Sequence, residues 1–84
     1  METRLAVISI IVEEQEQASK INELLHDNAQ YIVGRLGVPY RPKNVSVISV
    51  VLDAPQNAIS ALSGKLGMLS GVSSKTVYSK IGQG

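Results

Sequence analysis

The chain has 84 residues, of which 44% are hydrophobic and 18% charged, and its formal net charge is +1. This composition is typical of one small globular domain, and it excludes a disordered chain and a charge field strong enough to indicate DNA or membrane binding. The sequence contains no cysteine, which excludes disulfides and thiolate chemistry. We expect one domain over residues 1–84, with an ordered core of about residues 4–80.

The N-terminal third predicts a strand followed by a helix. Residues from Arg4 to Glu13 are rich in valine and isoleucine, as in a buried strand. The apolar run is too short to cross a bilayer and no small-residue cleavage site follows it, so we expect a cytoplasmic protein. A helix is predicted to begin after three glutamates, which favour a helix N-terminus, and to end near Asp27 and Asn28. The residues at helical spacing are Ala18, Ile21, Leu24, Leu25 and Asn28.

The remainder predicts two strands, a helix and a last strand. Residues 31–40, YIVGRLGVPY, read as an edge strand that Gly34 and Gly37 interrupt, and residues 44–53, NVSVISVVLD, as a second buried strand. Asp53 is then a candidate N-cap and Gly67 a candidate C-terminal cap of a helix whose apolar face is Ala58, Ile59, Leu62 and Leu66. The segment GVSSKTVYSK predicts a weaker strand, and we expect the tail GQG to be mobile.

The order strand, helix, strand, strand, helix, strand predicts an α+β fold, the ferredoxin-like βαββαβ sandwich. Its four-stranded antiparallel sheet has the first and third strands at the centre and both helices on one face. A wet sheet face should alternate apolar and polar residues. If Ser9 is matched with Ser49, however, the side without helices is mostly aliphatic. We therefore expect a homo-oligomer, dimer or tetramer, whose interface consists of Leu5, Val7, Ile11, Val45, Val47 and Val51.

The first half of the hairpin is a candidate ligand or partner site made of Tyr31, Arg35, Gly37, Tyr40 and Arg41. A guanidinium beside a phenol can bind carboxylate or phosphate, and glycine lets a ligand approach the backbone. The alternative is a purely structural hairpin, with arginines for solubility and prolines that blunt the edge. Tyr31, Val33 and Arg35 are expected on one side of this strand.

The residues give little support for a phosphate-binding, catalytic, metal-binding or nucleic-acid-binding site. Ser63, Gly64 and Lys65 lack the spacing of a phosphate loop. The single histidine, His26, fits a solvated helix position, and we expect no catalytic residue, no metal and no cofactor. The basic residues are scattered, so we do not expect nucleic-acid binding by this chain alone.

Several segments together resemble the family called iron-only hydrogenase system regulators. They are RLAVISIIVEE, INELLHDNAQYIVGRLGVPYR, VSVISVVLDA and ISALSGKLGMLSGV, from Arg4 to about Val77. The resemblance implies an ACT-like fold similar to the C-terminal domain of the nickel-responsive repressor, oligomeric assembly and a regulatory role. That repressor has a separate DNA-binding domain and a nickel site of several histidines and a cysteine. Residues 1–84 leave no room for such a domain and contain only His26 and no cysteine, so we expect neither direct nickel sensing nor autonomous DNA binding.

The resulting expectation is a non-catalytic ACT-like regulatory module, a homo-oligomer that senses a small effector and acts through a regulatory protein partner. The alternatives are a purely structural protein-protein interaction module and a nucleic-acid-binding regulator that uses Arg35, Arg41 and Lys43.

Overall fold

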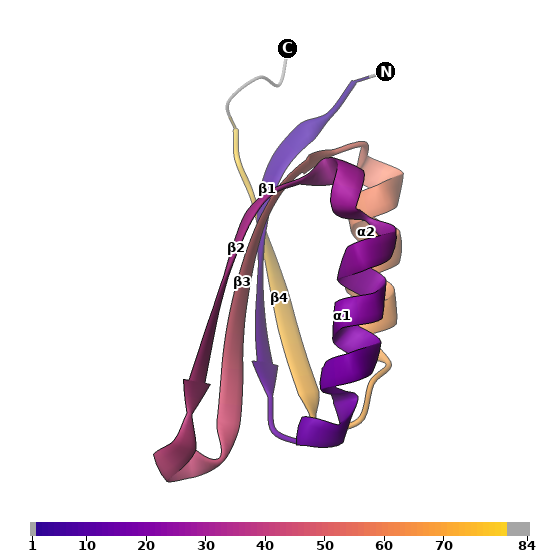
Figure 1. The fold of residues 1–84 in the computed structure, drawn as a ribbon. Coiled ribbons are helices and arrows are strands. Elements are labelled where there is room, and N and C mark those ends of the chain that lie inside the picture. The colour runs from indigo at the N-terminus through magenta and orange to yellow at the C-terminus, as the bar shows by residue number, and fades with distance from the viewer. Residues whose placement is uncertain (1, 81–84) are drawn as a thin grey trace.

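The computed structural model describes residues 2–80, so the tail GQG lies outside the described residues. Four strands form one antiparallel sheet in the order β2-β3-β1-β4, and two helices cover one of its faces (Figure 1). The strands are β1 (Arg4–Val12), β2 (Ile32–Tyr40), β3 (Val45–Ala54) and β4 (Val72–Tyr78), and the helices are α1 (Ala18–Asp27) and α2 (Gln56–Gly67). Short 3-10 turns lie at Gln15–Gln17, Ala29–Tyr31 and Arg41–Lys43. This is the expected ferredoxin-like βαββαβ fold.

The core lies between the sheet and the helices. Alternate residues of the central strands face it because successive side chains of a strand point to opposite sides. The helices contribute residues three or four positions apart, which share one side of a helix. The buried core consists of Ala6, Ile8, Ile10, Val12, Ile21, Leu25, Val50, Leu52, Ala54, Ile59, Leu62 and Leu66. No helix within residues 2–80 is long and apolar enough to cross a membrane.

The start of α2 differs from the sequence expectation. Pro55, not Asp53, is the N-cap residue, and no side chain caps the helix there. Asp53 is still part of β3, which runs through Ala54. Pro55 is buried and has the extended backbone of an N-cap residue, with φ −59° and ψ 148°. The apolar packing of Ala54 and Pro55 therefore carries the chain directly from the strand into the helix.

The edge strand β2 also differs from expectation, because it is continuous across both glycines and contains a bulge. Ile32 pairs with Leu52 and Gly34 with Val51, so Val33 is an additional residue with no partner in the register. Beyond the bulge every side chain lies on the opposite face from the one that simple alternation from Ile32 would give. Tyr31 belongs to the preceding 3-10 turn, so Tyr31, Val33 and Arg35 do not form one side of a strand.

The backbone conformation at Gly71, in the connection between α2 and β4, requires a residue without a side chain. Its φ is +69°, a Cβ there would collide with the side chain of Glu14, and its carbonyl accepts a hydrogen bond from the Glu13 amide at 2.7 Å. A left-handed conformation costs an L-residue about 1–2 kcal/mol. We expect Gly71→Ala to lower the free energy of unfolding by about this amount in urea titrations.

Gly64→Ala is the matched control for this prediction. Gly64 lies inside α2, and a Cβ added there meets nothing within 4 Å. Alanine should stabilise this position by about 0.5–1 kcal/mol because glycine loses more conformational entropy in a helix. Equal effects of the two alanine substitutions would contradict our account of Gly71.

Candidate functional site

The sheet face without helices is largely apolar. We call it the open face. Cross-strand pairs confirm the match of Ser9 with Ser49, and they place Val7 beside Val51 and Ile11 beside Val47. The six aliphatic residues expected on this side are all there: Leu5, Ile11 and Val47 are exposed and the others half-buried. Val77 of β4, paired with Val7, extends the same surface.

The bulge in β2 enlarges the open face. Leu36 pairs with Ser49, Val38 with Val47 and Tyr40 with Val45, so all three side chains lie on this face. Leu36 is 64% exposed and Tyr40 47% exposed. If Val33 occupied a regular position in the register instead of a bulge, these side chains would point toward the helix layer. The open face therefore extends as an apolar surface across the sheet. It is interrupted by a polar row of Ser49, Ser9 and Lys75, and it also carries Asp53 beside Leu5 and Ser73 beside Ile11.

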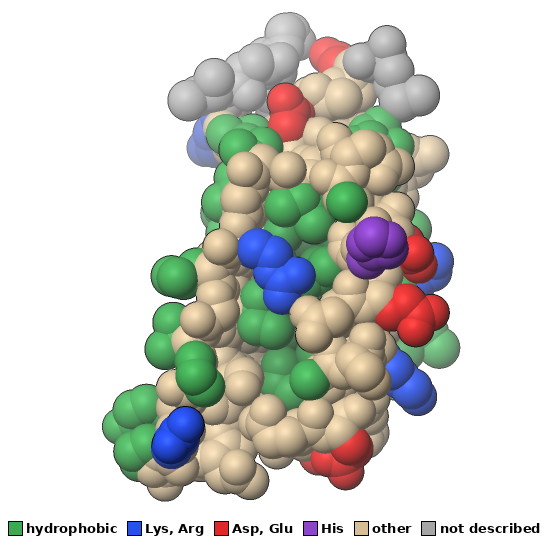
Figure 2. All heavy atoms as spheres, viewed as in Figure 1, with side chains coloured by type: hydrophobic (Ala, Val, Ile, Leu, Met, Phe, Trp, Pro, Cys, Tyr) green, Lys and Arg blue, Asp and Glu red, His purple; other side chains and the backbone are tan. Residues whose placement is uncertain are grey.

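The opposite side of β2 forms one wall of a groove. Two helices do not cover four strands, and a hollow with hydrophobic side chains at its bottom remains between β2 and α1 (Figure 2). We call it the β2–α1 groove. Its larger part has a volume of about 520 Å³ and is lined by Asn22, Leu25, His26, Ala29, Ile32 and Arg35. A second part of about 260 Å³ continues along β2 past Gly37 and Pro39 to Ile48.

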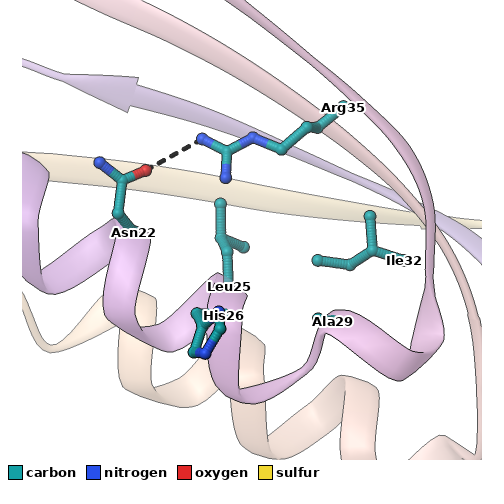
Figure 3. Close-up of a pocket in the computed structure, with 6 residues that line it drawn as sticks. All are labelled: Asn22, Leu25, His26, Ala29, Ile32 and Arg35. Atoms are coloured by element: carbon teal, nitrogen blue, oxygen red, sulfur yellow. Dashed lines mark hydrogen bonds between the residues drawn. The ribbon is translucent and has the colours of Figure 1, made fainter.

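Arg35 crosses this groove. Arg35 pairs with Val50, which is 0% exposed, so Arg35 occupies a position of β2 that faces the helix layer. Its guanidinium extends above Leu25 toward α1, and Nη2 donates a hydrogen bond to Oδ1 of Asn22 at 3.0 Å (Figure 3). Within residues 2–80 no carboxylate pairs with this guanidinium. A positive charge is thus held over an apolar floor by one neutral partner.

The residues expected to form a site in the hairpin are separated by the fold. Arg35 and Gly37 both line the β2–α1 groove. Tyr40 and Arg41 line a different hollow of about 200 Å³, at the hairpin end near Gln15 and Asn44. Tyr31 is half-buried and packs against the core. The fold therefore brings these residues together in two pairs, with Tyr31 apart from both.

Sequence reasoning did not find the α1 side of the groove. Asn22 and His26 are exposed, lie one helical turn apart and look like ordinary solvated positions. Only the bulge in β2 places a guanidinium opposite them, and a bulge of this kind has no clear sequence signal apart from the nearby Gly34. Among residues 2–80, no three His, Cys, Asp or Glu side chains lie close enough together to hold a metal ion.

The topology and register define a ferredoxin-like domain with an apolar open face and a basic residue in a lateral groove. The family model of TM1266-like proteins, described as iron-only hydrogenase system regulators, matches residues 4–76. The chain belongs to this family.

One solved structure supports this assignment, and others share the fold. The uncharacterized protein TM1266 from Thermotoga maritima has 45% sequence identity and a TM-score of 0.89, and the match covers 94% of this chain and 100% of that one. The C-terminal domain of the MgtC protein from Mycobacterium tuberculosis has 11% identity and a TM-score of 0.66, with 95% and 92% coverage.

A formyltetrahydrofolate deformylase from Pseudomonas putida KT2440 has 10% identity and a TM-score of 0.63, over 87% of this chain and 28% of that one. At this low identity it shares the fold alone, as the MgtC domain does. No curated protein matches the chain.

Proposed function

We propose that this chain is a non-catalytic regulatory module of the iron-only hydrogenase system that works as a homo-oligomer in the cytoplasm. The open face joins the subunits, a small effector sets the state of the oligomer, and a protein partner receives the signal. Membership of a regulator family supports the regulatory role. The ACT-like character expected from the sequence fits the same βαββαβ topology.

The apolar open face is the observation that supports the proposed oligomer. Its residues lie on adjacent strands, and Leu5, Ile11, Leu36, Val38, Tyr40, Val47 and Val77 are all exposed. Exposed apolar rows of this kind on neighbouring strands favour an interaction site. Burial of each aliphatic side chain contributes about 1.5–3 kcal/mol, which several residues together can set against the cost of association.

A second copy of the chain is the occupant that this surface fits best. Two copies related by a two-fold axis present the same surface to each other, so apolar rows of one subunit can pack on those of the other. Sheets pack face to face through their apolar sides in this way. The polar row of Ser49, Ser9 and Lys75 lies between the apolar rows, where the serine hydroxyls can form hydrogen bonds with polar groups of the second copy.

Native mass spectrometry and light scattering of the full chain test the proposal together. We expect a dimer or tetramer at micromolar concentration, and a bound small molecule in protein purified without denaturation. A clean monomer would rule out assembly through the open face. A ligand-free oligomer that no effector alters would favour a purely structural interaction module instead. Salt-sensitive binding to nucleic acid would favour a nucleic-acid-binding regulator.

A further inference from the structure

The β2–α1 groove combines one unneutralised cation with an apolar floor. The guanidinium of Arg35 has five N–H donors, and within residues 2–80 its one side-chain partner is the Asn22 amide oxygen at 3.0 Å. The other donors are free to bind an oxygen ligand, and a planar carboxylate can accept two of them at once. The groove is also lined by the apolar side chains of Leu25 and Ile32.

The position of Arg35 results from a specific backbone feature. The bulge at Val33 turns Arg35 toward the helix layer, opposite the fully buried Val50. Bulges commonly re-aim one side chain beside a functional site. The next position on the same side of β2 is Gly37, and a Cβ there would meet nothing within 4 Å. The strand therefore presents a basic residue next to a position without a side chain, and the space over Gly37 remains open for a ligand.

The lining of the groove selects among anionic ligands. Neither part of it is lined by an Asp or Glu of residues 2–80, so an ammonium group would lose its hydration without gaining an acidic partner. An amino acid is disfavoured for this reason. A free phosphate or sulfate would use Arg35 but would leave Leu25, Ile32 and Ile48 without contact. A chain of several carbons ending in one carboxylate uses both the cation and the floor.

We propose that the β2–α1 groove binds a small aliphatic monocarboxylate, with its carboxylate on Arg35 and its hydrocarbon chain along Leu25, Ile32 and Ile48. This inference rests on the effector-sensing part of the proposed function and gives that effector a site and a chemical class. Asn22 orients the guanidinium through its amide oxygen (Figure 3). His26 lies at the α1 edge of the groove.

Titration of the ¹⁵N-labelled full chain with hexanoate, followed by NMR, tests the proposal. We expect saturable shifts at Asn22, Arg35 and Gly37. Acetate has the charge without the chain, hexanol the chain without the charge, and leucine adds an ammonium group. Each should bind at least about tenfold more weakly than hexanoate, since each loses one class of contact. Inorganic phosphate should compete only weakly.

Variants locate the ligand. Arg35→Gln removes the charge, keeps hydrogen-bonding capacity and should weaken hexanoate binding at least about tenfold, with an unchanged thermal midpoint. Arg41→Gln is the matched control because Arg41 lies in the other hollow, and it should leave binding unchanged. Arg35→Lys should bind with intermediate affinity, since it keeps the charge but loses the planar fork.

Three results would overturn this inference. They are shifts confined to the open face at Leu36 and Val38, equal affinity of Arg35→Gln and the unchanged protein, and tighter binding of leucine or phosphate than of hexanoate. Each of these would leave the proposed oligomer and its regulatory role standing if mass spectrometry shows the assembly. A monomer that binds hexanoate through Arg35 would support the groove as a ligand site and would contradict the proposed oligomer.

Discussion

Leu62→Ala is expected to lower the free energy of unfolding by about 2–5 kcal/mol. Leu62 lies on the inner side of α2, is 1% exposed and belongs to the core between the helices and the sheet. Truncation to alanine removes buried methyl groups and leaves a cavity that the tightly packed neighbours fill only in part. Urea or guanidinium titrations followed by circular dichroism measure the change.

His26→Ala is the control for this result. His26 is exposed on α1, and its removal should change the free energy of unfolding by no more than about 0.5 kcal/mol. Similar losses in the two variants would mean that the inner and outer sides of the helices have been assigned wrongly. If the protein is an oligomer, both variants must be compared at one protein concentration, because dissociation then contributes to the measured stability.

Val47→Glu is expected to shift the protein toward monomer or aggregate. Val47 is 39% exposed, and its neighbours on the adjacent strands are Ile11 and Val38, so it lies within the open face. In a stacked pair of sheets the new carboxylate would be buried without a partner, at a cost of several kcal/mol. Light scattering and sedimentation measure the population of each species.

Met68→Glu introduces the same charge away from the open face. Met68 follows α2 and is 85% exposed, so its replacement should leave the oligomer intact. Circular dichroism should show folded protein for both variants, since neither position contributes to the buried core. Loss of assembly in both variants would indicate a general charge effect and would contradict an interface on the open face.

The sequence predicts the fold well where one face of an element is buried. Both sides of β1 and β3 are mostly aliphatic, and the match of Ser9 with Ser49 selects the register and the inward side that the structure shows. The apolar spacing of Ile21 and Leu25, and of Ile59, Leu62 and Leu66, predicts which sides of α1 and α2 are buried. Burial enforces these patterns because a slip of one residue would expose the whole core face.

The sequence predicts less at the edge of the sheet. In β2 only Ile32 packs against the core, so burial does not constrain its alternation, and the faces of Arg35 and Tyr40 depend on where the strand bulges. The candidate site is divided for the same reason. The prediction of Asp53 as the N-cap was wrong because Asp53 remains paired with Leu5 in the sheet. A local capping preference takes no account of that pairing.

The additional residue in β2 gives this strand one position that can be lost without a change of its two faces. In a surface loop, the loss of one residue alters little beyond the loop itself. Deletion of Val33 would have a similarly local effect, because Ile32 already pairs with Leu52 and Gly34 with Val51. Regular alternation from Ile32 would then keep Arg35 in the groove and Leu36 on the open face. Relatives that differ in length by one residue at this position can therefore share both faces of the sheet.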